Sequence, residues 1–540
     1  MKFLRKNFEQ ISFILISFLM LDVTIVNISM ALSSHTNIMT YPFLGVEILL
    51  SSLLLFGISF LISNLLYKKL ISWAIIIYFL YTSFSYLLQV TRNVNDPSFK
   101  VEKIFQNHFL QLYFLPVLFV ITVMVVLYKL VFKLKRWTTF EGLHIDESNS
   151  NRIEDLLLAQ FLLSLVFSDN KFLNVITKTG FLSKFYEEKL QINELFVFSL
   201  TSLIFLIFAI GSVLSFLAVK GMRDLYKNKN SVSVTVLFSA VFAMIFNYTI
   251  QNSIRGDISV LDLRLFAGAS LFQIIIFFIT FVWLYVIFNR FLLPTMLILT
   301  VGVGSSIASS LKFQYRQEPI LPSDLVWLRN PKILLDFLNG HYIIYVILAL
   351  LLLGFLYWIF RKKILPNKMI LSTKYRMILL VLPIIFYLGL FQVFSSKKDG
   401  KITENIPVVS ILNNYHDLTW FGNTVNSQIR SLAFVWFAQL SDTTMTRPKQ
   451  YSKKTIKNLE EKYKHIATNY NQSRIEKIEN QTVIYLLSES FSDPARVEGV
   501  KLSQNPISNI QDIKNQTTSG LMKSDGYGGG TANMEFQSLT

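Results

Sequence analysis

The sequence predicts a polytopic α-helical membrane domain followed by the start of an extracellular α/β domain. Hydrophobic residues make up 52% of the 540 residues and charged residues only 16%, with a mean hydropathy of +0.46. Apolar runs long enough to cross a hydrocarbon core of about 30 Å recur as far as residue 394. Beyond residue 447 the chain is mostly polar, with one short apolar run of the kind found in buried strands.

Ten apolar runs have the length of membrane spans. The first follows Lys2, Arg5 and Lys6 and lacks a small-residue cleavage site, so we expect a retained helix instead of a signal peptide. Ten crossings would place the basic loop Arg361–Arg376 outside the cell, against the positive-inside rule. The runs lie near residues 11–32, 42–66, 71–90, 109–132, 195–219, 231–250, 267–288, 291–311, 342–360 and 377–394.

The uncharged stretch Leu156–Ser168 removes this conflict if it is an additional crossing. It has 13 residues, about 20 Å as a helix, which suffices if neighbours bury it or if the bilayer is locally thin. Counting it gives eleven spans, with 20 Lys and Arg in 66 cytoplasmic residues against 13 in 99 residues outside. This topology predicts a multi-pass cell-membrane protein whose C-terminal domain is extracellular.

Changes in composition mark the domains. We expect a multispan domain over 1–394, an interfacial juxtamembrane linker over 395–446 and the N-terminal part of a globular domain over 447–540. Trp420–Leu440 is too polar to span and aromatic enough to lie among lipid headgroups. The 94 residues from Arg447 are too few to bury an α/β sheet, so we expect the chain to end inside that domain and to be inactive alone.

Composition also excludes several classes of protein. The net charge of +17 lies mostly in short loops between apolar runs, where membrane topology explains it, so no nucleic-acid partner is expected. Membrane lipids are the expected surroundings. The absence of cysteine excludes a disulfide framework and a cysteine-based metal site.

The longest outer loop of the membrane domain, Lys312–His341, contains the segment KFQYRQEPILPSD at 312–324. Its two prolines favour an extended, semi-rigid backbone. Arg316, the nearby lysine and the aromatic residues could cradle a lipid phosphate at the bilayer surface. An interfacial hairpin that only caps helices explains the same residues equally well.

The residues best suited to chemistry lie in the last sixty. Thr482–Leu487 has the pattern of a strand buried in a parallel sheet, and Glu489 follows its carboxyl end, where open α/β sheets bind ligands. That carboxylate is a metal ligand or a helix cap. Gly529 and Gly530, in a triple-glycine run, allow the backbone to approach an anion closely. Thr531 directly follows them, as a nucleophile or as a plain N-cap.

These two segments resemble the lipoteichoic acid synthase family of membrane phosphoglycerol transferases, within the sulfatase and alkaline phosphatase superfamily. The resemblance implies that Thr531 is the nucleophile that takes glycerol phosphate from phosphatidylglycerol. It also implies that Glu489 and Thr531 bind Mn²⁺ or Mg²⁺, with further ligands expected after Thr540. The resemblance rests on SESFSDP at 488–494, GGGTANMEF at 528–536, EPILPSD at 318–324, and Pro448, Tyr451 and Ser452.

The predicted acceptor follows from the number of spans. Eleven spans, where the simplest lipoteichoic acid synthases have five, resemble the streptococcal enzymes that attach glycerol phosphate to side-chain sugars of cell-wall polysaccharides. Metal-dependent transfer to such a polysaccharide is therefore favoured, with lipoteichoic acid synthesis on a glycolipid as the alternative. Met534 departs from the small polar residue usual in the family. A non-enzymatic transporter or sensor with a degenerate exterior domain is the alternative of another class.

Overall fold

The computed structural model describes a helical bundle and parts of the region that follows it. It divides into two compact units, Met1–Asp417 with Thr424–Ser441, and Leu418–Asn423 with Asp442–Thr540. The predicted spans 11–32, 42–66 and 109–132 lie almost wholly outside the described residues. The described residues are 64–96, 98–107, 147–169, 194–256, 265–266, 268–329, 340–398, 400–404, 406–414, 422–441, 450–474, 484–488 and 491–521, with 109, 126, 172, 482 and 535 singly.

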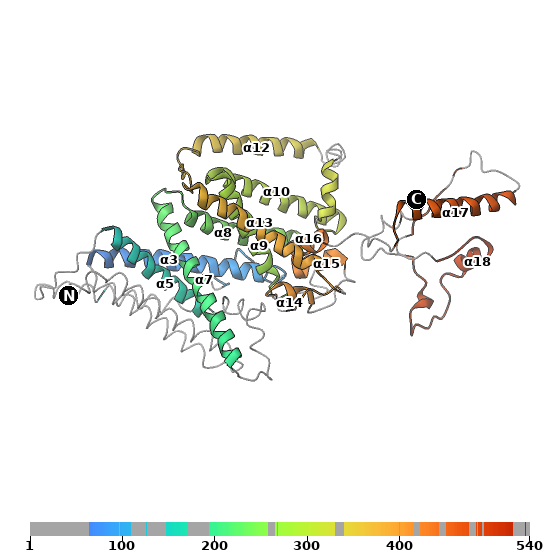
Figure 1. Ribbon diagram of the computed structural model, residues 1–540, viewed down its shortest axis with the longest axis horizontal. Helices are drawn as coiled ribbons and strands as arrows, with labels where there is room; N and C mark the ends of the chain where they lie inside the picture. Colours follow the sequence, from blue (N-terminus) through green and yellow to red (C-terminus); the bar gives the residue numbers. More distant parts are fainter. Residues whose placement is uncertain are drawn as a thin grey trace, which may run out of the picture. The chain divides into compact units, whose positions relative to one another are not determined.

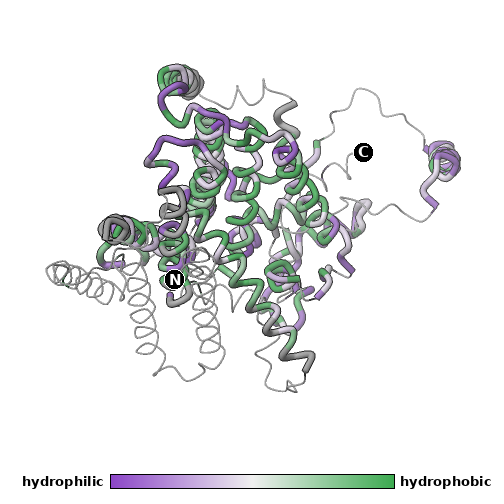
Figure 2. Tube along the Cα trace, turned by 60° about the vertical axis from the view of Figure 1, so that its left-hand side comes forward, coloured by the Kyte–Doolittle hydropathy of each residue, from purple (hydrophilic) through white to green (hydrophobic). Residues whose placement is uncertain are grey.

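Among the described residues, six helices are long and apolar enough to cross a membrane. Each covers one of the predicted spans, and α12 (Gly340–Phe360) covers another (Figure 1). Figure 2 shows hydrophobic residues along most of the bundle, with hydrophilic ones mainly near its loops. The six are α3 (Asn64–Arg92), α7 (Glu194–Tyr226), α8 (Val232–Ser253), α9 (Ala269–Phe288), α10 (Leu292–Arg316) and α13 (Thr373–Ser395).

Several of these helices expose large apolar side chains, as a lipid environment requires. Phe205 in α7 is 61% exposed and Leu388 in α13 is 65% exposed. Outside a membrane, faces of this kind would place a large apolar area in water, at a cost of about 25 cal/mol for each Å². The first unit is therefore a membrane-embedded bundle.

The interior of the bundle packs around α9, which contributes to two buried clusters. One joins α8, α9 and α10 and includes Phe246 and Tyr285, whose hydroxyl lies 2.7 Å from the Thr295 hydroxyl. The other joins α9, α13 and α16 (Leu432–Ser441). In it the Phe434 ring meets the Phe394 ring edge-on, with centroids 5.1 Å apart. These contacts fix α9 as the centre of the unit.

Gly302 allows α10 to approach α8 closely. A Cβ atom there would lie 2.3 Å from ring atoms of Phe246, which is only 3% exposed and has little room to move. We expect Gly302→Ala to destabilise the bundle by about 1–3 kcal/mol through overpacking. Gly304→Ala in the same helix is the matched control, because nothing lies within 4 Å of its Cβ position. Denaturant titration in detergent measures both; equal stability of the two variants would contradict the packing.

The short predicted span lies within α5 (Glu147–Ser168), which packs against α3 and α7. Near its start, Glu154 pairs with Arg223 of α7 across 3.1 Å, and both side chains are buried. Just past its end, the Asp169 carboxylate accepts a hydrogen bond of 2.7 Å from the Ser85 hydroxyl of α3. The helix therefore lies alongside its two neighbours over its whole apolar length, in the buried setting that its shortness requires.

One end of the bundle gathers the loops after α7, α9 and α12, and we call it the Lys363 end. The Asn228 side chain donates to the Lys363 carbonyl oxygen across 2.8 Å. The Asn289 side chain donates to the Ile370 carbonyl oxygen across 2.9 Å. Arg223, which holds the start of α5, lies one turn before Asn228, so the start of α5 is at this end too.

The opposite end, the Gln428 end, gathers the segments after α3 and α8. Asn95, three residues past α3, donates to the Gln428 carbonyl oxygen across 3.0 Å. Gln251, in the last turn of α8, donates to the same oxygen across 3.2 Å and to the Ser427 carbonyl oxygen across 2.6 Å. The chain after α3 and the chain after α8 therefore lie on the same side of the bundle.

The segment expected to be an interfacial linker is partly built into the bundle. Thr424–Ser441 belongs to the first unit, and its helices α15 (Gly422–Arg430) and α16 meet at Ser431, whose φ is +79°. Gln428 and Phe434 are buried. The polar side chain of Gln428 has a partner in this buried position, because it donates to the Ile254 carbonyl oxygen across 2.9 Å.

Candidate functional site

The second unit contains helix α17 (Lys453–Gln472), the short 3₁₀ helix η5 (Pro494–Arg496) and helix α18 (Ser508–Gln516). Ser452 caps α17, because its hydroxyl accepts a hydrogen bond from the Thr455 amide across 3.2 Å. Asp493 caps η5 by accepting from the Ala495 amide across 2.9 Å. Asp493 and Pro494 of the segment SESFSDP therefore begin a 3₁₀ helix in this structure. The Asp493 carboxylate is used to accept a hydrogen bond from a backbone amide.

The predicted strand Thr482–Leu487 is not formed among its described residues. Residues 482 and 484–487 have no regular secondary structure, and Ile484 and Leu486 are 84% and 91% exposed. A strand depends on hydrogen bonds and burial supplied by neighbouring strands. The described residues of the second unit include no second strand, so an apolar run suited to the middle of a sheet has nothing to pair with.

The principal predicted catalytic residues lie outside the described residues. This holds for Glu489, Gly529, Gly530 and Thr531, so their roles stay predictions. Within the part of the chain that the structure describes, no three His, Asp or Glu side chains gather in a way that could hold a metal ion. Arg316 lies within the described residues, at the end of α10.

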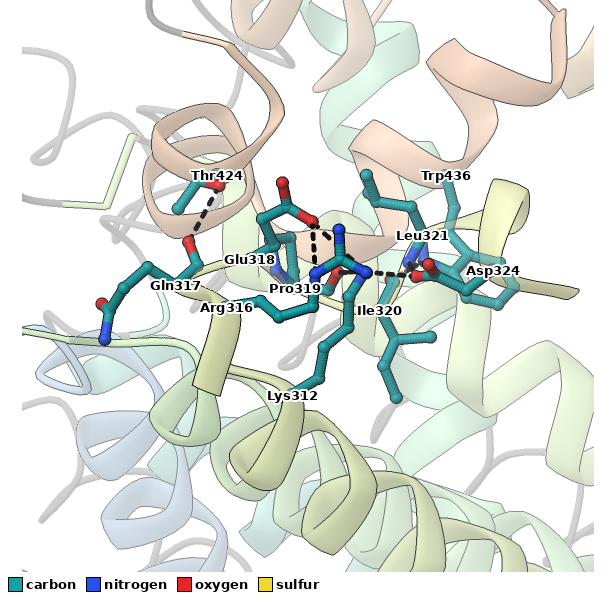
Figure 3. A network of polar contacts seen from close by, with 10 residues as sticks. All are labelled: Lys312, Arg316, Gln317, Glu318, Pro319, Ile320, Leu321, Asp324, Thr424 and Trp436. Atoms are coloured by element: carbon teal, nitrogen blue, oxygen red, sulfur yellow. Dashed lines mark hydrogen bonds and ion pairs between the residues drawn. The ribbon is translucent and has the colours of Figure 1, made fainter. Parts of the chain in front are cut away.

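The loop after α10, which the sequence predicts to be an outer loop, is held by an ionic and hydrogen-bonded network, drawn in Figure 3. Lys312 lies 2.6 Å from an Asp324 carboxylate oxygen and donates to the Pro319 carbonyl oxygen across 2.8 Å. The same Asp324 oxygen accepts from the Leu321 amide across 2.7 Å. Asp324 lies in η3 (Pro322–Arg329), so these contacts close the loop into a compact structure between α10 and η3. The extended, semi-rigid segment predicted from the two prolines is instead bent back onto Lys312.

Lys312 and Arg316 therefore have different roles. The Lys312 side chain is 15% exposed, and Asp324 neutralises its charge. A Glu318 carboxylate oxygen also lies 3.7 Å from the Lys312 ammonium, so Lys312 fastens the loop. The Arg316 side chain is 60% exposed, and its ion pair with Glu318 is long, at 3.9 Å. Of the two cations, Arg316 has donors free to meet an anion. Tyr315 beside it is 84% exposed, as in an interfacial aromatic belt.

A contact that the sequence analysis missed fastens the same loop to α16. The Trp436 indole donates to the Ile320 carbonyl oxygen across 2.7 Å, and the Thr424 hydroxyl donates to the Gln317 carbonyl oxygen across 3.3 Å (Figure 3). One feature of the sequence indicated such a contact: Trp436 lies in an apolar stretch, and a buried indole N–H needs an acceptor. The acceptor is more than a hundred residues away in sequence, so only the fold identifies it.

Two comparisons with known proteins gave matches, and one of them locates a family at the C-terminus. Residues 481–540 match the family model described as Sulfatase. The chain is 22% identical, over 271 residues, to a protein of Rhizobium meliloti (strain 1021) named "Putative cyclic beta-1,2-glucan modification protein". That match covers 49% of this chain and 39% of the relative, so the chain spans well under half of the relative's length. No solved structure matches significantly. The protein thus joins a membrane-embedded helical bundle to a sulfatase-family domain at its C-terminus.

Proposed function

We propose that the complete protein transfers glycerol phosphate from phosphatidylglycerol to a carbohydrate acceptor outside the cell. The observation that carries this is the sulfatase-family match over 481–540, because it contains both Glu489 and Thr531 in a chain that also has a membrane bundle. The relative's name, which refers to modification of a cyclic glucan, supports a polysaccharide acceptor over a glycolipid. Transfer to a glycolipid, as in lipoteichoic acid synthesis, is the second candidate.

The proposed reaction has two balanced steps. The Thr531 oxygen attacks the phosphorus of phosphatidylglycerol, a Thr–O–P bond forms, and the bond from phosphorus to the diacylglycerol oxygen breaks. Diacylglycerol leaves with the proton that Thr531 gave up. A sugar hydroxyl then attacks the same phosphorus, a bond from the sugar oxygen to phosphorus forms, and the Thr–O–P bond breaks. The hydroxyl proton returns to the Thr531 oxygen, and glycerol phosphate is joined to the sugar. Backbone N–H groups after Gly529 and Gly530 are suited to stabilise the phosphoryl charge in both steps.

The membrane bundle has the role of bringing the lipid donor to this domain. Arg316 is our candidate for the contact with the donor phosphate, because among the described side chains of this loop it is an exposed cation and carries a fork of donors that matches phosphate oxygens. Lys312 is excluded from that role by its pairing with Asp324. A transporter or sensor is less well supported, because the sulfatase-family match contains both residues that the transfer needs.

The proposal requires the C-terminal domain to be outside, and the fold supports eleven spans. Asn95 and Gln251 donate to one carbonyl oxygen, so the loop 91–108 and the loop 251–266 share a side. Ten spans, with 109–132 crossing, would put those loops on opposite sides. The additional crossing is α5, which starts at the Lys363 end. The last turns of α7, the next labelled helix, lie at the Lys363 end as well. The basic loops make the Lys363 end cytoplasmic.

Cysteine labelling tests this topology, since the chain has no native cysteine. Lys227→Cys lies at the Lys363 end, so an impermeant maleimide added to intact cells should leave it unlabelled until the cells are opened. Ser473→Cys, after α17, should be labelled from outside at once. Labelling of Lys227→Cys in intact cells, or protection of Ser473→Cys, would be incompatible with eleven spans.

A metal-dependence experiment tests the proposed function. The oxygen donors of Glu489 and Thr531 suit a hard divalent cation such as Mn²⁺ or Mg²⁺, which would supply Lewis-acid stabilisation of the phosphoryl group. In the complete protein, chelation should stop diacylglycerol release from labelled phosphatidylglycerol. Glu489→Gln should weaken metal affinity by at least about 100-fold, because the loss of an outer-shell partner alone costs about 10- to 100-fold.

The matched control is Glu498→Gln, an exposed glutamate of the same domain that should change neither quantity. Metal content is measured separately from activity by elemental analysis of the purified protein. Unchanged metal content in Glu489→Gln would make Glu489 a structural residue. Diacylglycerol release that survives complete chelation would remove the support for a sulfatase-type reaction.

A further inference from the structure

The loop after α12 is folded against the Lys363 end of the bundle. Leu365, Met369 and Ile370 are all less than 10% exposed and belong to the buried cluster that α8, α9 and α10 form. Leu365 has a φ of +44°, a left-handed conformation that a leucine keeps only where surrounding contacts hold it. The loop therefore has one defined conformation, in which its apolar side chains are anchored.

Asparagine side chains from two neighbouring loops hold this backbone. Asn228 donates to the Lys363 carbonyl oxygen and accepts from the Leu365 amide, both across 2.8 Å. Asn289 donates to the Ile370 carbonyl oxygen across 2.9 Å and accepts from the Ile370 amide across 2.8 Å. Asn230 adds a bond of 2.8 Å to the Asn367 carbonyl oxygen. The backbone that carries the loop's exposed side chains is thereby held in place by the protein itself.

Many of the side chains exposed to solvent at this end are cations: Lys227, Lys229, Arg361, Lys362, Lys363, Lys368 and Lys374. Among the acids described here, Glu154 and Asp155 both pair with Arg223, and Asp224 is buried. The described acids at this end do not pair with these cations, and a group of like positive charges attracts anions from outside the protein.

Apolar side chains beside these cations indicate the kind of anion. Tyr226 is 82% exposed, Leu371 is 89% exposed and Tyr375 is 66% exposed. The loop joins two apolar helices directly, so these side chains lie at the level where a bilayer meets water, the usual position of tyrosine belts. A soluble polyanion offers no partner for them, whereas a phospholipid offers a headgroup to the lysines and acyl chains to the rings and leucine.

We propose that the Lys363 end is a preorganised binding surface for anionic phospholipid headgroups of the adjacent leaflet. Lys362, Lys363 and Lys368 bind the headgroup phosphates, and the asparagine-held backbone keeps their spacing. This surface is separate from the donor contact at Arg316, which lies at the far end of α10. It does not depend on the proposed transferase activity.

Lipid titration followed by native mass spectrometry tests this surface. The full chain, freed of native lipid in detergent, is titrated with phosphatidylserine and separately with phosphatidylcholine. Phosphatidylserine is anionic, and its headgroup is serine instead of the glycerol that the proposed reaction transfers, so it is not a donor for that reaction. Lys362→Gln/Lys363→Gln/Lys368→Gln should weaken phosphatidylserine binding by roughly 100-fold, at about fivefold for each cation, and should leave phosphatidylcholine binding unchanged.

The control removes three exposed lysines from α17, as Lys453→Gln/Lys454→Gln/Lys457→Gln, which should bind phosphatidylserine like the parent chain. Thermal unfolding without lipid checks that the loop variant folds, since the three side chains contribute no buried contact. Equal phosphatidylserine affinity in the two triple variants would overturn the proposal. So would a parent chain that binds phosphatidylserine no more tightly than phosphatidylcholine, or one in which inorganic phosphate displaces the lipid completely.

Discussion

Thr531→Ala in the complete protein is expected to lower diacylglycerol release from phosphatidylglycerol by at least about 10⁴-fold, because the variant has no oxygen to attack the phosphorus. Transfer to the acceptor should fall equally, since both steps pass through the same covalent intermediate. Thr531→Ser keeps a hydroxyl at the same distance from the backbone and should retain a measurable part of the activity.

Mass spectrometry of the protein quenched during turnover should find glycerol phosphate on the peptide that contains Thr531. Thr518→Ala, an exposed threonine of the same unit, is the matched control and should keep full activity. Donor cleavage by Thr531→Ala at the parent rate would refute the covalent route. The glycine run and Thr531 would then be a phosphate-binding segment without a nucleophile.

Arg223→Gln is expected to destabilise the membrane bundle by about 3–5 kcal/mol, as the loss of one partner of a buried ion pair does elsewhere. Arg223 binds Glu154 across 3.1 Å and Asp155 across 2.8 Å, and the Glu154 side chain has no exposed surface. Its guanidinium also lies 5.6 Å from the Trp73 ring of α3. Removing it leaves two buried or half-buried carboxylates unpaired and separates α5 from α7.

Denaturant unfolding in detergent measures this loss. Arg92→Gln, an exposed arginine of the same bundle, should change stability by less than about 1 kcal/mol. The double variant Glu154→Gln/Arg223→Gln should recover part of the loss, because one of the stranded charges is gone. If Arg223→Gln is as stable as Arg92→Gln, the cluster does not hold α5 in place and the short helix must be held by its apolar contacts alone.

Hydropathy located the described spans because a helix that crosses a bilayer must be apolar over the thickness of the hydrocarbon core. The helices α8, α9, α10 and α13 start and end within a few residues of the predicted runs. The short stretch Leu156–Ser168 was predicted as a crossing from loop charges alone. Its immediate neighbours, and the buried Arg223 that holds its start, could not be read from the sequence, because they join residues about seventy positions apart.

The candidate site was predictable only in part. The motifs around Glu489 and Thr531 led to the sulfatase family, which the match over 481–540 supports, but no described residue tests their geometry. The apolar run Thr482–Leu487 predicted a strand from local pattern alone. Its described residues form no strand, because a strand needs a neighbouring strand to bond with and the described part of the second unit contains none. The outer loop showed the same limit: sequence marked Lys312 and Arg316 alike as cations, and only the position of Asp324 separates them.

The sequence by itself determined the membrane character of this protein, the positions of its long helices, the sign of charge on its loops and the family of its C-terminal residues. Each of these is a local property, set by the composition or order of neighbouring residues. The tertiary structure alone decided that Lys312 is neutralised, that Arg316 is open to an anion, that α15 and α16 enter the bundle, and that asparagines fix the basic loop at the Lys363 end. Those features depend on distances between residues far apart in the chain, which packing sets and sequence order does not encode directly.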